Sequence, residues 1–236
     1  MNNKEQLQKN LAVTYEVDGQ QIKLTPQIVQ DYIVGTGAQI TIPEFKMFTE
    51  LCKVRGLNPF LREAYCIKYS NKTPATIVVG KDAILKRAVL NPKYNGMKSG
   101  IIVTNENGEE KKRTGTFKLP TETLVGGWAE VFRKDWENSI EASVSLEEAI
   151  QRKSDGEPNS NWTKQPATMI EKVAKVRALR EAFVEDLGGM YEADEMNVDL
   201  PEIRDEDKVI LQGDQNIPEA EIKDDSNIKQ VDINEL

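Results

Sequence analysis

The charged side chains divide the 236-residue chain into two parts of different character. Residues 191–236 contain 15 acidic and 4 basic side chains, and no aromatic residue follows Tyr191. A segment with so few large apolar side chains cannot offset the entropy lost on folding, so we expect residues 196–236 to form an acidic, mostly disordered tail. Residues 1–190 carry 27 basic and 24 acidic side chains. The formal net charge of −8 therefore does not exclude a nucleic-acid partner.

The composition excludes several kinds of catalytic and metal site. The chain has no histidine, which removes Ser-His-Asp and Cys-His catalysis and every histidine-containing metal site. Two cysteines, Cys52 and Cys66, are too few for a Cys₄ zinc site or a disulfide framework, and they indicate the reduced thiols of a cytosolic protein. No apolar run approaches the ~18 residues of a transmembrane helix. We expect a cytoplasmic protein without a membrane partner.

Two further enzyme classes fit the sequence poorly. Gly80-Lys81-Asp82 follows a predicted strand, but it lacks the earlier glycine and the Ser/Thr of an NTPase phosphate loop. The acidic residues show no spacing typical of a metal-dependent nuclease. We therefore predict a protein that is not an enzyme and that needs no cofactor.

The order of the predicted elements favours an α+β fold with a small antiparallel sheet, flanking helices and one long basic helix. Helices are predicted to begin at Pro26 and Pro43, and a third is predicted to be capped by Asp82. Gly126-Gly127 indicates a bulge or a close backbone approach, and Ser145 to Glu148 has the pattern of a capping box. The predicted strands are 63–69 and 75–79, which form a hairpin, and then 99–104, 110–117, 123–133 and 139–144.

The long helix, predicted over residues 166–187, places a cation within an apolar face. Met169, Val173, Val176, Phe183, Val184 and Leu187 share this face, and Arg180 lies near its centre. A guanidinium there needs a partner. Either Arg180 forms a buried ion pair, with Asp82 or Glu63, or it reaches a nucleic-acid phosphate in a groove floored by the helix. In the second case Lys172 and Arg177, at the edges of the face, extend the phosphate track.

Other candidate contacts lie near the ends of predicted elements. Each basic residue alone also fits a solvated surface charge. Trp162 precedes the basic helix in a predicted polar loop, where it is placed to stack on a base or to pack at a groove mouth. The basic candidates outside the helix are Arg62, Lys81, Lys86, Arg133, Lys134 and Lys164.

Several blocks of sequence, in this order over residues 30–195, resemble phage recombination proteins of the Bet type, within the RecT/Redβ superfamily of single-strand annealing proteins. The blocks include Gly56 to Phe60, Glu63-Ala64-Tyr65, Val78 to Asp82, Tyr94-Asn95-Gly96, Gly127-Trp128-Ala129, Phe132-Arg133-Lys134, Gln165-Pro166, Ala178 to Phe183 and Gly188 to Tyr191.

The resemblance implies ATP-independent binding of single-stranded DNA and annealing to a complementary strand. It implies homo-oligomers, as rings or helical filaments, that work in phage recombination beside a 5′→3′ exonuclease and a host single-strand-binding protein. It also assigns DNA contact to Arg133, Lys134, Trp162, Lys172 and Arg180, and matches Lys86 to a basic position of a relative. Ala167-Thr168 replace two basic residues of the lambda-type relative, and the short acidic C-terminal region does not resemble that relative's partner-docking domain.

From these features we expect an N-terminal segment, residues 1–40, with oligomer contacts, an annealing core, residues 41–195, and the tail, residues 196–236. Two other functions remain open from sequence. One is a protein that coats single-stranded DNA without annealing it, and the other is a protein–protein adaptor that uses the acidic tail.

Overall fold

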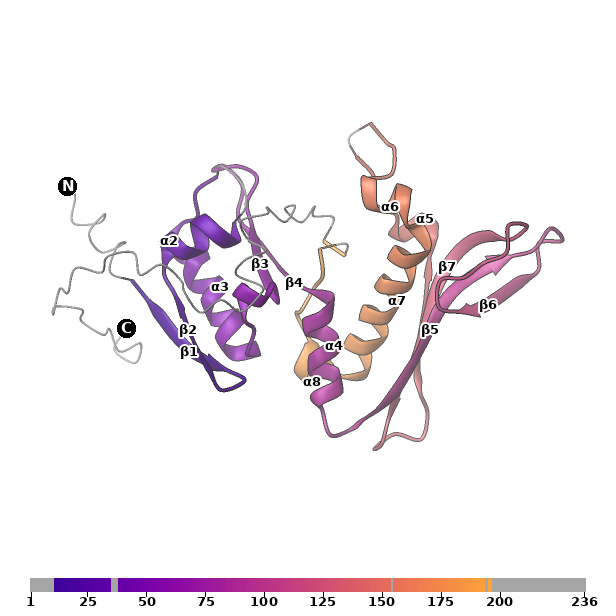
Figure 1. The fold of residues 1–236 in the computed structure, drawn as a ribbon, viewed down its shortest axis with the longest axis horizontal. Coiled ribbons are helices and arrows are strands. Elements are labelled where there is room, and N and C mark those ends of the chain that lie inside the picture. The colour runs from indigo at the N-terminus through magenta and orange to yellow at the C-terminus, as the bar shows by residue number, and fades with distance from the viewer. Residues whose placement is uncertain (1–10, 35–37, 154, 194, 197–236) are drawn as a thin grey trace. The chain divides into compact units, whose positions relative to one another are not determined.

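The computed structural model describes residues 11–34, 38–153, 155–193 and 195–196, which form two compact units (Figure 1). The first unit contains the described residues up to Leu61 together with Lys68–Ala75, and the second contains Arg62–Ile67 and the described residues from Thr76 onward. The predicted domain boundary after residue 40 does not coincide with this division. Apart from Met196, the predicted disordered tail lies outside the described residues.

The first unit joins a β-hairpin to a helix. Strands β1 (Val13–Val17) and β2 (Gln20–Leu24) pair antiparallel through Asp18 and Gly19, whose φ angles of 51° and 78° suit a tight hairpin turn. The hydroxyl of Tyr15 donates to the carbonyl of Leu57 at 2.9 Å. This bond ties the hairpin to the end of the helical region. The other elements are α2 (Pro26–Ile28), the π-helix η1 (Val29–Ile33), α3 (Ile42–Arg55) and the 3₁₀ helix η2 (Pro59–Leu61).

Helix α3 begins at a capping box that the sequence analysis did not identify. The backbone N–H of Thr41 donates to the Glu44 carboxylate at 2.7 Å, and the Thr41 hydroxyl accepts from the backbone N–H of Glu44. The same carboxylate accepts from Lys68 at 2.8 Å and from the backbone N–H of Ala75 at 2.8 Å. Burial alone raises the pKa of Glu44, but these hydrogen bonds outweigh it and lower the pKa to about 2. Glu44 therefore fastens residues 68–75 to the start of α3.

We expect this carboxylate to make the protein sensitive to acid. Because its folded pKa lies below the ordinary value of 4.5, its stabilisation is complete above about pH 4.5 and is lost as the pH falls towards 2. Glu44→Gln should reduce stability by about 1–2 kcal/mol at neutral pH, after allowance for solvent screening, and by less near pH 3. Urea unfolding followed by circular dichroism measures this. Glu50→Gln, on the exposed surface of the same helix, is the control, and an equal loss in both variants at both pH values would contradict the assignment.

The second unit contains a four-stranded antiparallel sheet in the order β6-β5-β7-β8. Its strands are β5 (Tyr94–Thr104), β6 (Glu110–Thr114), β7 (Thr123–Arg133) and β8 (Ile140–Ser145). The predicted α+β fold and the predicted hairpin are confirmed, the latter as β3 (Ala64–Ile67) and β4 (Thr76–Val79). The β7 bounds are as predicted, and β5 begins five residues earlier than expected. Trp128 is buried in β7, and its indole N–H donates to the carbonyl of Arg113 at 3.1 Å.

The two glycines within β7 serve different purposes. The register between β5 and β7 shifts beside Gly126, so that Val125 has no direct partner on β5, which is the bulge that the sequence predicts. Gly127 faces a helix so closely that an added Cβ would lie 2.5 Å from the carbonyl oxygen of Ile170. Both of the alternatives predicted for this pair are therefore present, one at each glycine.

The long basic helix is α7 (Pro166–Ala182), and Figure 1 shows it lying along the sheet with α4 (Lys81–Leu90) on its other side. Buried residues therefore occur nearly all round α7, and the single apolar face predicted from periodicity is incomplete. The helix is interrupted at Phe183, with φ −129° and ψ 50°, before α8 (Val184–Leu187). The shorter helices are α5 (Leu146–Ala149) and α6 (Ser160–Lys164).

Two predicted helix starts are wrong in detail. Helix α4 is capped by the backbone of Gly80, not by Asp82, which lies in the first turn. Ser145 is the N-cap of α5, but its side chain makes no capping hydrogen bond. Asp82 and Ser145 have residue types that favour capping, but neither side chain caps a helix: Asp82 lies two residues after the N-cap, and Ser145 makes no capping bond.

Candidate nucleic-acid interface

The second unit gathers three of the predicted DNA-contact cations around one set of glutamates. Lys86 of α4 pairs with Glu63 at 2.8 Å, and Lys172 of α7 pairs with Glu192 at 2.5 Å. Arg180, two turns further along α7, binds both carboxylate oxygens of Glu195, at 2.6 and 2.7 Å. We call Lys86, Lys172 and Arg180 the paired cations.

Tyr65 of β3 links a fourth predicted residue to this region. Its phenol hydrogen-bonds with the side chain of Arg62, which has a φ of 59°. Burial raises the pKa of Tyr65, and the nearby positive charges of Arg62 and Lys172 partly oppose that rise. Arg62, Lys86, Lys172 and Arg180 therefore contribute to one basic region, built from the start of β3, from α4 and from α7.

A short segment after α8, residues 190–193 and 195–196, supplies the acidic partners. We call it the C-terminal turn. Met190 and Ala193 are buried, and the carbonyl of Tyr191 accepts from the backbone N–H of Val79 at 2.8 Å. The side chains of Glu192 and Glu195 are only 3% and 6% exposed, whereas those of Lys172 and Arg180 are 20% and 18% exposed. The turn is thus anchored in the core and places the carboxylates of Glu192 and Glu195 against Lys172 and Arg180 of α7.

The two alternatives predicted for Arg180 can now be compared. Arg180 does form an ion pair, but its partner is Glu195 and neither Asp82 nor Glu63. Its guanidinium also lies 4.7 Å from the centre of the Tyr191 ring, a cation–π distance. Burial lowers the pKa of Arg180, and the hydrogen bonds to Glu195 more than offset this and raise it. The open groove expected above this face of α7 is occupied by the C-terminal turn.

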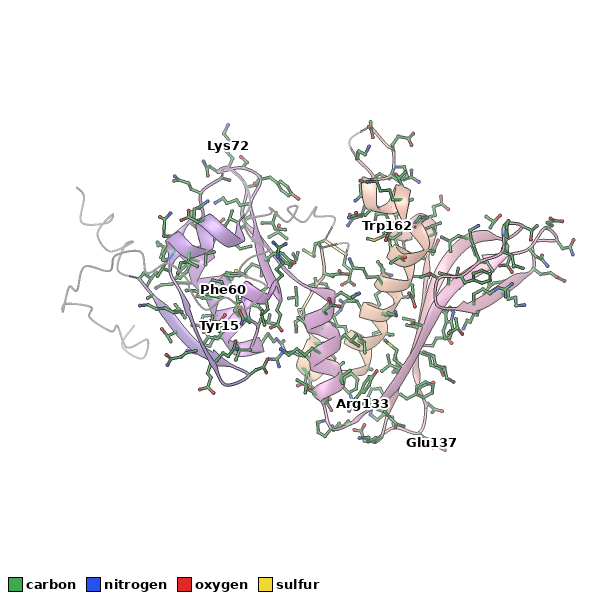
Figure 2. The ribbon with its side chains drawn as sticks, in the orientation of Figure 1. Tyr15, Phe60, Lys72, Arg133, Glu137 and Trp162 are labelled. Atoms are coloured by element: carbon green, nitrogen blue, oxygen red, sulfur yellow. The ribbon has the colours of Figure 1, made fainter. Side chains whose placement is uncertain are left out.

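Arg133 lies in a different environment, at the end of β7 (Figure 2). Its side chain is 3% exposed, and it binds Asp135 at 2.9 Å, Glu185 at 3.2 Å and the carbonyl of Ala182. The hydrogen bonds that Arg133 donates to Asp135 raise the pKa of Arg133, and the guanidinium holds the pKa of Asp135 well below its usual range. Arg133 therefore fastens the end of α7 to the sheet, and in this structure its charge is already satisfied.

Its neighbour Lys134 is exposed, and the Lys134 amine donates to the carbonyl of Pro92 at 3.0 Å. The adjacent residues of the predicted Arg133-Lys134 block thus point into different surroundings. Only Lys134 presents its charge to solvent.

Trp162 lies near the opposite end of α7 from Arg133 (Figure 2). It belongs to α6 and not to a loop, because Asn159 caps that helix with its side-chain oxygen. The indole is 1% exposed, so the exposed position expected of a base-stacking residue is not found. The indole nitrogen is buried without a hydrogen-bond partner. Lys164, two residues further along, is exposed.

Two predicted residues remain on open surfaces of the second unit. Lys81 begins α4, with a side chain 43% exposed, and it forms an ion pair with Asp82 at 3.4 Å. Arg177 of α7 is partly exposed, and within the described part of the chain it has no ion-pair partner. Arg177 and Lys164 are thus available to bind an external anion.

The glutamates are the residues that the sequence analysis did not assign to the site. Glu192 and Glu195 were counted as part of the acidic C-terminal charge, and Glu63 was weighed only as a partner of Arg180. Their pairing depends on how the chain returns after Gly188-Gly189, which no local pattern encodes. The one available signal is that an arginine at the centre of an apolar helix face requires a carboxylate nearby.

A metal site is absent from the described residues. No group of three or more cysteine, aspartate or glutamate side chains in these ranges is arranged to hold a metal ion. None of the helices in the described ranges has both the length and the apolar character needed to cross a bilayer.

Comparison with known proteins identifies the chain at the family level. Curated proteins gave no match. The model of the RecT family matches residues 20–211, which include β2, the paired cations, Arg133, Trp162 and the C-terminal turn. The match covers well over half of the chain and includes every residue proposed above for DNA contact. The chain therefore belongs to the RecT family.

Proposed function

We propose that this chain anneals complementary DNA strands without ATP, acting as an oligomer that holds each strand by its phosphates. The observation that carries the proposal is the RecT family match, because membership implies single-strand annealing in recombination. Annealing breaks no covalent bond, so it needs no nucleophile and no cofactor. It needs a reduction of the repulsion between two polyanions, which Lys and Arg contacts to phosphate supply.

The basic region of the second unit supports this proposal. Arg62, Lys86, Lys172 and Arg180 lie in it, and Arg177, Lys164, Lys81 and Lys134 add accessible charge on other faces of the unit. Contacts of this kind position the DNA backbone without reading sequence. An oligomer then allows each subunit to bind weakly while the assembly binds tightly.

The cellular setting follows from the resemblance. We propose that the protein works in the cytoplasm of a bacterial host during phage recombination, as a ring or helical filament. Its partners are a phage 5′→3′ exonuclease, which exposes the strand, and the host single-strand-binding protein. The acidic tail is proposed to restrain unproductive DNA binding or to recruit one of these partners.

An annealing assay tests the proposal. Two complementary oligonucleotides carrying a fluorophore and a quencher should pair faster in the presence of the full chain, without ATP. A protein that only coats DNA would slow the pairing, and an adaptor would retain no DNA and show no dependence on salt. Negative-stain images taken after the strands are added in succession would show whether an assembly forms on the first strand or only on the pair.

Arg177 offers the simplest test of a single contact. We expect Arg177→Ala to weaken binding to single-stranded DNA by about 1 kcal/mol, or roughly fivefold, and to lower the slope of log K against log salt by about 0.7. The fold should be unaffected, because the side chain has no ion-pair partner among the described residues. Fluorescence anisotropy over a range of salt concentrations measures both quantities. Lys72→Ala, which removes one exposed charge from the first unit, is the matched control, and equal effects of the two variants would remove Arg177 from the interface.

A further inference from the structure

We propose that Glu192 and Glu195 occupy the phosphate positions of the basic region, so that DNA binds by exchanging one phosphate for each carboxylate. This inference rests on the proposed function, since it assumes that the region binds single-stranded DNA. It adds two acidic residues to a mechanism that otherwise involves only cations.

The geometry at Arg180 is that of an anion site already filled. Its two terminal nitrogens lie 2.6 and 2.7 Å from the two oxygens of Glu195, the forked arrangement in which a guanidinium also binds phosphate. The centre of the Tyr191 ring lies 4.7 Å from the guanidinium carbon, a cation–π contact on the same side chain. The Lys172 amine lies 2.5 Å from a Glu192 carboxylate oxygen, the kind of point contact that a lysine also makes with a phosphate oxygen.

The backbone that carries these carboxylates is fixed. Met190 and Ala193 are buried, Ala193 packs with Ile67 and Val78, and the carbonyl of Tyr191 is bonded to β4. The Glu195 carboxylate also accepts from the backbone N–H of Glu192 at 3.2 Å. The exchange therefore requires the glutamate side chains to rotate into solvent and this one hydrogen bond to break, while Met190, Tyr191 and Ala193 stay in place. Glu195 is followed by one further described residue, Met196, which is exposed.

The exchange has an energetic reason. Arg180 and Lys172 are mostly buried, and a buried cation without an anion costs several kcal/mol. The glutamates remove that cost when no DNA is present and keep each cation in its binding position. When a phosphate replaces a carboxylate, the cation stays paired throughout, so the net gain per contact is small. Weak binding per subunit suits an assembly that must let strands slide until they match.

The salt dependence of binding distinguishes this mechanism from simple phosphate contact. A cation that is free before binding releases a counterion from the DNA, which contributes about 0.7 to the slope of log K against log salt for a single strand. A cation that exchanges a carboxylate for a phosphate releases the same DNA counterion, but the freed carboxylate then gathers cations from solution. Exchanged contacts therefore contribute less to the slope than free ones.

The experiment compares Glu195→Gln with Glu181→Gln in the full chain. Both variants remove one negative charge near Arg180, because the charges of Glu195 and Glu181 both raise the pKa of Arg180. Only Glu195 also accepts hydrogen bonds from its guanidinium. We expect Glu195→Gln to bind a fluorescent oligothymidylate about tenfold more tightly than the unmodified chain near 0.1 M salt, with a slope steeper by up to about 0.7. Glu181→Gln should show only a small general gain, and Glu195→Asp, which keeps the charge, should restore the original slope.

Each outcome decides between the mechanisms. If Glu195→Gln binds no better than Glu181→Gln, or has an unchanged slope, Glu195 is only a structural partner and the inference is overturned. If circular dichroism shows that Glu195→Gln does not fold, Glu192→Gln tests the same exchange at Lys172. If neither variant folds, both glutamates are structural and the inference is also overturned. If the unmodified chain and all variants fail to bind DNA, the proposed function itself is wrong.

Discussion

Arg133→Ala is expected to destabilise the protein by about 2–4 kcal/mol, because it removes a cation at the centre of a packed cluster. The guanidinium lies 4.1 Å from the ring centre of Trp136 and 5.0 Å from that of Phe183, and it satisfies Asp135, Glu185 and the carbonyl of Ala182. Fully buried ion pairs cost more to break, but the carboxylates of Asp135 and Glu185 are 37% and 47% exposed and can be solvated.

Lys134→Ala is the matched control for this prediction. It removes the same charge from the next residue, whose exposed amine makes a single hydrogen bond to Pro92, so its cost should stay within about 1 kcal/mol. Urea unfolding of both variants gives the comparison. An Arg133→Ala variant with unchanged stability and lost DNA binding would show that Arg133 acts as a phosphate contact and not as a structural link between α7 and the sheet.

Gly127→Ala is expected to cost about 3 kcal/mol, near the upper end of the range for overpacking a core. The added Cβ would lie 2.5 Å from the carbonyl oxygen and 2.8 Å from the carbonyl carbon of Ile170, so the sheet and α7 would have to separate. Neither atom belongs to a flexible side chain. Since Arg180 and Lys172 are carried by α7, DNA binding should weaken together with stability.

Gly156→Ala is the control, because it tests the cost of an unfavourable backbone conformation where the added Cβ has enough space. Gly156 has a φ of 88° but no atom within 4 Å of an added Cβ, so Gly156→Ala should cost only the roughly 1 kcal/mol of a left-handed residue. Thermal unfolding of both variants ranks the two costs. A Gly127→Ala variant as stable as Gly156→Ala would mean that β7 and α7 are packed less closely than the structure indicates.

Elements with a strong local signal were predicted well. The bounds of β7 match because alternating apolar residues lie between turn residues, and the β3–β4 hairpin follows from its central turn. The capping boxes show the limit of such signals. Both Thr41 to Glu44 and Ser145 to Glu148 fit the pattern, but only the first forms, where Glu44 is also held by Lys68 and Ala75. A capping-box sequence therefore does not by itself ensure that the capping hydrogen bonds form.

The sequence supplies the candidate cations but does not show which of them are paired with carboxylates. Basic residues can be located by inspection, and a cationic residue within an apolar face shows that a partner is needed. The identity of the partner depends on contacts between residues far apart in the chain, such as Lys172 with Glu192 and Lys86 with Glu63. For the same reason Trp162 was expected on the surface, although α6 packs against α7 and buries it.

The amino-acid sequence by itself determined the α+β class, the central strands, the long basic helix and, through ordered blocks of residues, the RecT family. These depend on short-range periodicity and residue type, which are properties of neighbouring positions. Only the tertiary structure decided which cations are exposed and which are paired, because burial and ion pairing depend on distances between remote segments. The same holds for Glu192 and Glu195: the sequence places them only in an acidic C-terminal region, and the structure buries them in ion pairs with Lys172 and Arg180, because the folded chain brings the two segments together.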